Sequence, residues 1–192
     1  MQTPVPLTQT FVYNCDGGYR LTVREEEKSL WLFFSSETRQ LTSAPSDIGQ
    51  RYTAPGIEFL ITGEEAQLII DEKNSIRCHN DRLAAIWEDA KFRKIEFRAA
   101  GNEPGWFAEV NREKIVFAGN YGQKLLIFPA VPAQRDDQLV ESKYVTRAGD
   151  HSFNMTLQPG DCRDSMSGDL FDTRVTLKLD GQTLYGCGKS LH

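Results

Sequence analysis

The sequence predicts an all-β protein of two antiparallel β-barrel or β-sandwich domains joined by one helix. Three observations carry this prediction. Apolar and polar residues alternate over most of the chain, turn residues recur roughly every ten residues, and only one stretch has apolar residues at helical spacing. The 192 residues are enough for one large domain or for two of roughly 90 to 100 residues each.

In the first half, period-two alternation begins at Phe11 and resumes after an Asp-Gly-Gly turn. Alternation of this kind is typical of half-buried antiparallel strands, because successive side chains point to opposite faces of the sheet. A hairpin turn is expected at residues 63–65. The predicted strands are residues 11–15, 19–23, 29–34, 39–41, 56–61 and 66–70.

Residues 81–94 break this pattern and are predicted to form the helix. Asp81 is a suitable N-cap, and the stretch contains neither Gly nor Pro. The apolar residues at helical spacing are Leu83, Ile86, Trp87 and Ala90. We expect the helix to join two domains or to plug the end of one, with the boundary near residues 79–93 and domains at residues 11–80 and 92–192.

Alternation returns after the helix, with turns such as residues 179–182 between the runs. Short strands at such regular spacing indicate a second β-barrel or β-sandwich. The predicted strands are residues 94–99, 106–110, 114–117, 124–128, 142–146, 152–157, 173–179 and 183–187.

The formal net charge of -5 excludes the positive field that drives nucleic-acid binding, and a basic partner is more easily imagined. No apolar run approaches the roughly 18 residues that a membrane helix needs. The spacing of the cysteines matches neither a zinc site nor a haem attachment motif, so we expect no metal and no cofactor.

The four cysteines divide two and two between the halves, which suggests one disulfide in each half and an oxidising compartment such as the bacterial periplasm. The alternative is four buried thiols in a cytosolic protein. The chain opens without a signal-peptide pattern. We therefore expect Met1 to be an added start residue and Gln2–Thr10 to be a polar linker after a removed signal or lipid-anchor segment.

Four motifs of the first half occur together: FVYNCDGG at residues 11–18, IGQRY at 48–52, IEFLITGEEAQL at 57–68 and IRC at 76–78. Over about residues 11–80 the chain resembles the membrane-bound lysozyme inhibitors of C-type lysozyme (MliC). The resemblance implies a small bacterial envelope β-barrel, usually carried on a lipoprotein, that is closed by a disulfide between Cys15 and Cys78. An unpaired buried thiol at each position is the alternative.

The MliC resemblance also implies a mechanism, in which a loop and an adjacent strand enter the lysozyme cleft. A serine of a Ser-Gly-x-x-Tyr motif and a lysine before a glycine then engage the catalytic carboxylates. Here Ile48 stands in place of that serine and Thr62 in place of that lysine, so inhibition is doubtful. Ser46 and Arg51 are candidate replacements for the two lost groups. The candidate lysozyme-contact residues are Ser46, Ile48, Gly49, Arg51, Tyr52 and Thr62.

Three interpretations of the Ser-, Pro- and Gly-rich loop before Gln50 stay open. It is a lysozyme-contacting edge, a surface for another envelope ligand, or a plain connection whose Gly and Pro serve the turn.

The second half resembles an uncharacterised bacterial envelope domain, through AAGNEPGWF at residues 99–107, DCRDSMSG at 161–168 and LYGCG at 184–188. This resemblance implies a disulfide between Cys162 and Cys187. Glu103 and Trp106 are candidates for lining a pocket for a sugar or peptide. The alternative is a tight turn with Trp106 in the core.

No enzyme activity is expected. A thiol site of Cys162 with His151 as base and Asp161 or Asp164 as its orienting group would need a reduced cysteine, and Cys187 would consume the thiol. The sequence therefore predicts a periplasmic or outer-membrane lipoprotein similar to C-type lysozyme inhibitors. The alternative is a non-catalytic binding or structural module of the envelope that contacts glycan, peptide or protein.

Overall fold

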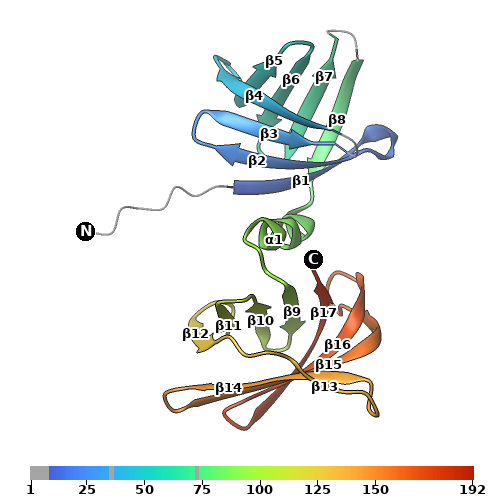
Figure 1. Ribbon diagram of the computed structural model, residues 1–192. Helices are drawn as coiled ribbons and strands as arrows, with labels where there is room; N and C mark the ends of the chain where they lie inside the picture. Colours follow the sequence, from blue (N-terminus) through green and yellow to red (C-terminus); the bar gives the residue numbers. More distant parts are fainter. Residues whose placement is uncertain (1–8, 35–36, 72–73) are drawn as a thin grey trace, which may run out of the picture. The chain divides into compact units, whose positions relative to one another are not determined.

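The computed structural model describes residues 9–34, 37–71 and 74–192 (Figure 1). The chain divides into two compact units, Met1–Asp89 and Ala90–His192. Apart from one 3₁₀ turn, the described residues form strands and a single α-helix, so the predicted all-β class is confirmed. The expected linker, Gln2–Thr10, lies outside the described residues except for Gln9 and Thr10, which begin the first strand.

The first unit is a closed eight-stranded antiparallel barrel with its strands in sequence order. It closes where residues 13–15 of β1 pair with residues 78–80 of β8. Residues 16–18 form a 3₁₀ turn, in which Gly17 and Gly18 adopt positive φ. The strands are β1 (Gln9–Cys15), β2 (Arg20–Glu26), β3 (Ser29–Phe33), β4 (Thr38–Ala44), β5 (Gln50–Ala54), β6 (Ile57–Thr62), β7 (Glu65–Ile70) and β8 (Asn74–Asn80).

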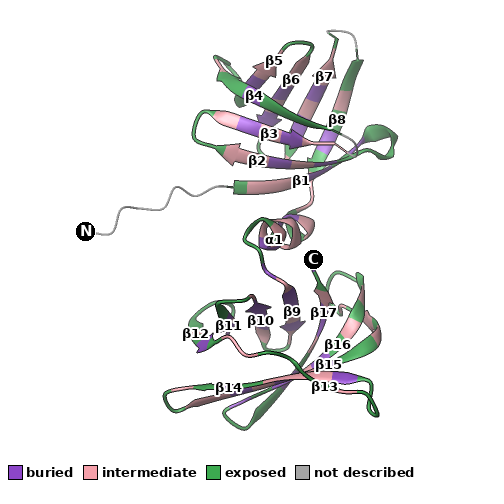
Figure 2. Cartoon of the chain, in the orientation of Figure 1, coloured by how far each residue is buried: buried purple, intermediate pink, exposed green. Residues whose placement is uncertain are grey.

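Buried residues alternate with more exposed ones along strands of the barrel, as the colours of Figure 2 show. In β3, for example, Leu30 and Leu32 are buried, and Ser29, Trp31 and Phe33 are half-buried. Barrels of eight strands are just wide enough for side chains to fill. The edge of the Tyr13 ring packs on Phe59, with ring centroids 5.4 Å apart. The buried cluster also includes Leu21, Val23, Leu41, Tyr52, Ile61, Ala66 and Leu68.

The helix α1 (Arg82–Phe92) follows β8 and begins as predicted. Asp81 is its N-cap, because its Oδ1 accepts a hydrogen bond from the Ala84 N–H at 3.0 Å. The strand predicted from Lys94 begins later, at Phe97, because Lys94 has a φ of +58°, which does not fit a strand.

The second unit is one nine-stranded antiparallel sheet with the order β12-β11-β10-β9-β17-β16-β15-β14-β13. The sheet curls, since β12 and β14 contact each other and the Thr146 hydroxyl donates to the carbonyl of Pro129 at 3.3 Å. The strands are β9 (Phe97–Asn102), β10 (Gly105–Val110), β11 (Lys114–Gly119), β12 (Lys124–Pro129), β13 (Gln134–Asp136), β14 (Glu141–Ala148), β15 (His151–Arg163), β16 (Leu170–Leu179) and β17 (Gln182–Ser190).

The curled sheet encloses its own apolar core. The rings of Phe128 and Phe153 lie 5.0 Å apart, and Met155 is fully buried. Two carboxylates, those of Glu109 and Glu141, are buried outside this apolar cluster. Glu109 accepts hydrogen bonds from Arg93 and from the buried Arg98, so its charge is compensated.

Candidate functional site

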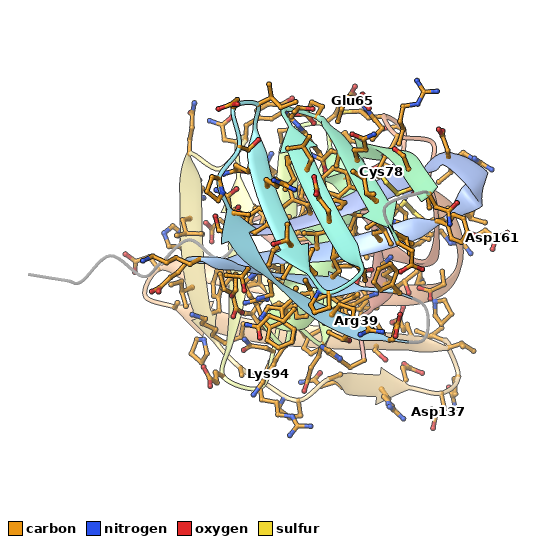
Figure 3. The ribbon with its side chains drawn as sticks, turned by 90° about the horizontal axis from the view of Figure 1, so that it is seen from above. Arg39, Glu65, Cys78, Lys94, Asp137 and Asp161 are labelled. Atoms are coloured by element: carbon orange, nitrogen blue, oxygen red, sulfur yellow. A yellow bond between two sulfur atoms is a disulfide. The ribbon has the colours of Figure 1, made fainter. Side chains whose placement is uncertain are left out.

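Both disulfides implied by the two resemblances are present. Cys15 on β1 and Cys78 on β8 are disulfide-bonded cross-strand partners where the barrel closes; Figure 3 labels Cys78. Cys162 on β15 is bonded to Cys187 on β17, and β16 lies between these two strands. None of the four cysteines, all of them described, is free, so the alternative of buried thiols is wrong.

The thiol site that the sequence argued against is not formed. Cys162 is consumed by its disulfide, and Nδ1 of His151, its candidate base, lies 2.7 Å from Oδ2 of Asp180. Asp164 is engaged in capping a turn: its Oδ1 accepts hydrogen bonds from the backbone N–H groups of Met166 and Ser167.

The loop of residues 45–49, between β4 and β5, is held by its own hydrogen bonds. The Ser46 hydroxyl donates to the carbonyl of Ile48 at 2.6 Å, and it accepts from the Ile48 N–H at 3.2 Å. The Ile48 side chain is 64% exposed. The loop thus presents an apolar side chain to solvent, while the nearby hydroxyl serves the turn.

Gly49 brings this loop against the end of β6. Its φ is +65°, and a Cβ at this position would lie 2.0 Å from the Ile61 carbonyl oxygen and 2.9 Å from Cγ2 of Thr62. Only glycine fits so close an approach at this φ. The structure therefore brings together the two segments in which the sequence predicted replaced motif residues, Ile48 beside Gly49 and Thr62 on the adjoining strand.

Arg51 and Tyr52 make contacts inside the barrel unit. The Arg51 guanidinium donates to Oε2 of Glu58 on the neighbouring strand at 2.6 Å. Tyr52 is buried, and its hydroxyl donates to Glu25. Burial and this hydrogen bond raise the pKa of the Tyr52 phenol. Both residues hold the strand that follows the loop.

The turn after Thr62 is acidic. Glu64 accepts from Asn80 at 3.1 Å and pairs with Arg82, whose hydrogen bond is the main cause that lowers the pKa of Glu64. Glu65, labelled in Figure 3, lies 2.7 Å from Nδ1 of His79. Thr62 itself is exposed and uncharged. Two carboxylates thus follow the position where the MliC resemblance implies a lysine.

Trp106 lies in the core of the second unit, as the alternative for this residue stated. Its Nε1–H donates to the Tyr185 carbonyl at 3.2 Å, and its ring stacks on Phe117. Glu103 is exposed and precedes Pro104 through a cis peptide bond. Neither residue lines a cleft that the second unit forms beside its disulfide.

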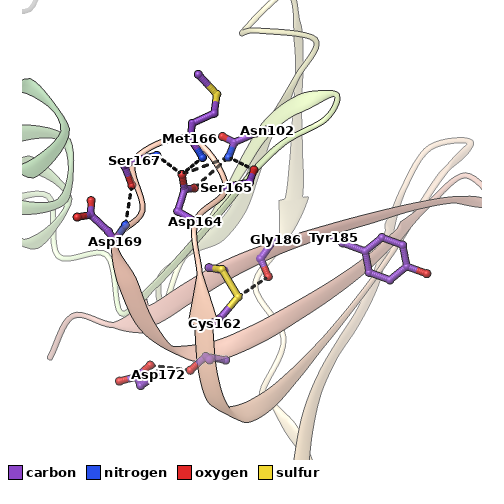
Figure 4. Close-up of a disulfide and its surroundings, with 12 residues drawn as sticks. Asn102, Cys162, Asp164, Ser165, Met166, Ser167, Asp169, Asp172, Tyr185 and Gly186 are labelled. Carbon is purple, nitrogen blue, oxygen red and sulfur yellow. Dashed lines mark hydrogen bonds between the residues drawn. A yellow bond between two sulfur atoms is a disulfide. The ribbon is translucent and has the colours of Figure 1, made fainter.

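That cleft, of about 380 Å³, lies beside the Cys162–Cys187 disulfide. It forms where the far end of β15 bulges between Pro159 and Cys162 and the disulfide ties it to β17 (Figure 4). The sequence analysis missed it, although a Pro-Gly pair inside an alternating strand is a signal for a bulge. It is lined by Ala100, Gly101, Asn102, Gln158, Cys162, Arg163, Asp164, Ser165, Arg174, Val175, Thr176, Tyr185, Gly186 and Cys187.

Among residues 9–34, 37–71 and 74–192, no three His, Cys, Asp or Glu side chains are grouped so that they could hold a metal ion. In the same part of the chain, no helix is both long and apolar enough to cross a membrane.

No curated protein matches this chain. A family model does: residues 13–76, which make up most of the barrel, match the family described as Membrane-bound lysozyme-inhibitor of c-type lysozyme, and this match confirms the resemblance drawn from the sequence of the first half.

Proposed function

We propose that this chain is a bacterial envelope protein without enzymatic activity. Like the C-type lysozyme inhibitors, it uses one edge of its barrel as a contact surface. The loop of residues 45–49 and the turn after Thr62 are its contact edge for a lysozyme cleft. The observation that carries this proposal is the close packing of Gly49 on Ile61 and Thr62, within a barrel whose sequence matches the inhibitor family.

Inhibition by this edge is weak, because the groups that would reach the catalytic carboxylates are replaced or occupied. Ile48 has no hydroxyl where the motif has serine, and Thr62 has no ammonium where the motif has lysine. Ser46 spends its hydroxyl on the Ile48 carbonyl, and Arg51 is paired with Glu58. A charge-assisted hydrogen bond is worth about 1.5–3 kcal/mol, so losing two lowers affinity by roughly a hundredfold or more.

We assign the protein to the periplasm or to the outer membrane as a lipoprotein, held by a segment that precedes the barrel. Two disulfides favour an oxidising compartment, and the matching family is described as membrane-bound.

The second candidate function is a binding or structural module for glycan, peptide or protein of the envelope. The exposed Ile48 and the acidic turn favour it, since neither an apolar side chain nor the carboxylates of Glu64 and Glu65 suit a cleft that is itself lined by carboxylates. Under this function the loop keeps its shape and has another partner.

A rate assay of cell-wall hydrolysis by C-type lysozyme tests the proposal. We expect weak or no inhibition by the unaltered chain and clear inhibition by the variant Ile48→Ser with Thr62→Lys. The matched control, Ile48→Ala with Thr62→Ala, should not inhibit. If the Ser and Lys variant folds but inhibits no better than the Ala control, the proposed contact edge is wrong.

We further propose that the predicted domains, residues 11–80 and 92–192, fold independently. In support, the barrel closes through its own β1–β8 ladder and has its own disulfide and core. A fragment of residues 1–89 should show a cooperative thermal transition; a fragment that stays unfolded under oxidising conditions would exclude independence.

A further inference from the structure

The walls of the cleft beside the Cys162–Cys187 disulfide are fixed by a covalent bond and by hydrogen bonds. The disulfide fixes one side, and the Asn102 amide fixes the other by donating to Asp164 at 3.2 Å and to the Ser165 hydroxyl at 3.0 Å (Figure 4). All of its lining residues are described. Its volume of about 380 Å³ falls in the range of about 300–1,000 Å³ that is usual for small-molecule sites.

Two arginines in this cleft differ from most others in the chain, which form ion pairs. Arg163 donates to the Gly168 carbonyl at 2.7 Å, and neither Arg163 nor Arg174 pairs with a carboxylate of the described residues. Asp172, the nearest acidic residue to Arg174 in the sequence, accepts a hydrogen bond from the Thr173 hydroxyl. The cleft thus contains cationic donors that the protein does not neutralise.

The backbone makes room for Arg174. Gly160 sits in the bulge of β15 with a φ of +140°, and a Cβ there would lie 2.6 Å from Nη2 of Arg174. Any other residue at position 160 would displace the guanidinium or strain the chain. The guanidinium of the exposed Arg174 therefore lies against the bulge, in space that Gly160 leaves open.

The charges of the cleft select the ligand. Two guanidiniums and the carboxylate of Asp164 line it, so its side chains carry an excess of one positive charge in a chain of net charge -5. Asp164 already accepts hydrogen bonds from Met166, Ser167 and Asn102. A ligand with one negative charge matches this balance, and a carboxylate can accept two parallel hydrogen bonds from a guanidinium.

We propose that the second unit binds a small ligand with one carboxylate in this cleft, anchored by Arg174 and assisted by Arg163. Ala100, Gly101 and Gly186, which carry no long side chain, also line the cleft. Such a carboxylate occurs at the free C-terminus of a short peptide and on an acidic sugar. This site is independent of the contact edge proposed for the barrel.

A ¹H–¹⁵N NMR titration of the full chain, at about 0.15 M salt to screen surface attraction, tests the proposal. The probes are two pairs: N-acetyl-Ala-Ala with its C-terminal amide, and glucuronate with glucose. We expect at least one acid to shift the amide signals of Asn102, Ser165 and Gly186 while its neutral partner does not. The pair that responds identifies the source of the carboxylate. Failure of both acids to shift these signals up to about 10 mM overturns the proposal.

The anchor is tested with Arg174→Gln, which keeps a hydrogen-bonding side chain without the charge. Its affinity for the responding acid should fall at least about tenfold, or about 1.4 kcal/mol. Arg147→Gln is the control, since Arg147 also lacks an ion pair with a described carboxylate but lies outside the cleft, and it should bind as the unaltered chain does. Arg163→Gln should show a smaller loss. If folded Arg174→Gln binds the acid as tightly as the unaltered chain does, Arg174 is not the anchor. If that variant does not fold, the comparison of each acid with its neutral partner on the unaltered chain still tests the proposed site.

Discussion

The contact edge of the barrel and the cleft of the second unit use their polar groups in opposite ways. At the barrel edge, the Ser46 hydroxyl and the Arg51 guanidinium are bonded within the protein. In the cleft, Arg174 forms no ion pair with a described carboxylate, and the backbone makes room for it at Gly160. Groups that are satisfied internally shape a surface, whereas a cation left unpaired is available to a ligand. In our two proposals, the barrel edge therefore supplies a shape and the cleft supplies binding chemistry.

The two disulfides differ in the same sense. Cys15–Cys78 joins strands that are already paired, so it adds a covalent bond to an existing ladder. Cys162–Cys187 joins β15 to β17 across β16, at the point where β15 leaves its regular register. The first disulfide stabilises a closed barrel, and the second holds one wall of the cleft.

Removing the disulfides should separate these roles and have the largest effect. Because the bridges span 63 and 25 residues, the chain-entropy model gives losses of about 4 kcal/mol for Cys15→Ala with Cys78→Ala and about 3.5 kcal/mol for Cys162→Ala with Cys187→Ala. Denaturant unfolding of each variant measures these losses. Only the second variant should also lose affinity for the carboxylate ligand. If the chain without Cys162–Cys187 binds the ligand as tightly as the unaltered chain, this disulfide does not hold the wall of the cleft.

Glu109 provides the next largest expected effect. Burial by itself would raise the pKa of this carboxyl, but the hydrogen bonds and charges of Arg93 and Arg98 outweigh it and hold the pKa below its usual value. Glu109→Gln removes the buried carboxylate that pairs with Arg93 and Arg98, so we expect a loss of about 3 kcal/mol in the free energy of unfolding. The exposed Glu113→Gln is the control and should change it by less than about 0.5 kcal/mol.

The same group gives a pH dependence. Because the pKa of Glu109 is lower in the folded than in the unfolded state, its contribution is present above the unfolded-state pKa and is lost as the pH falls through the folded-state pKa. Denaturant midpoints across the acid range should fall less steeply for Glu109→Gln than for the unaltered chain. Identical slopes would mean that Glu109 is not stabilised as described.

Gly49 and Gly18 form a matched pair that tests the packing of the contact edge. Both have positive φ, but a Cβ at Gly18 meets no atom within 4 Å, whereas one at Gly49 would lie 2.0 Å from the Ile61 carbonyl oxygen. Gly18→Ala should lower the free energy of unfolding by about 1 kcal/mol, because alanine is strained at a positive φ. Gly49→Ala should cost about 2 kcal/mol and shift the amide signals of residues 46–62. Equal costs with an unperturbed loop would exclude the close approach.

Two buried tyrosines supply the smallest expected difference. The Tyr52 hydroxyl donates to Glu25, whereas the Tyr13 hydroxyl has no hydrogen-bond partner among the described residues. Burial raises the pKa of Tyr13 to about 12. Tyr52→Phe should lower the free energy of unfolding by about 1 kcal/mol, and Tyr13→Phe should be neutral or slightly stabilising. Thermal unfolding of both variants checks this order, and a larger loss for Tyr13→Phe would reverse it.

Much of the fold could be predicted from the sequence because its strands carry their own period-two signal. Strands with little apolar content could not. In β5 only Tyr52 is buried, and in β8 only Cys78. These two strands are specified by pairing with their neighbours, which a local pattern does not contain. The bulge of β15 was missed for a related reason, since its role depends on the distant Cys187 and Arg174.

The candidate site was predictable only in part. Motif matching placed Ile48 and Thr62 at the contact edge, and the structure brings their segments together through Gly49. It could not indicate that the Ser46 hydroxyl turns back to Ile48 or that Arg51 pairs with Glu58, because these contacts depend on side-chain geometry. The cleft of the second unit combines residues from four strands, so no single motif could reveal it.

The affinity for C-type lysozyme, measured by calorimetry at about 0.15 M salt, tests most directly the claim that the barrel keeps the shape of an inhibitor without its chemistry. The account predicts weak binding by the unaltered chain. The variant Ile48→Ser with Thr62→Lys should bind lysozyme at least about a hundredfold more tightly than the unaltered chain does. A saccharide that occupies the active-site cleft of lysozyme should compete with this binding. Two results would contradict the account: tight binding of the unaltered chain that a saccharide in the lysozyme cleft displaces, or a folded variant with no higher affinity for lysozyme.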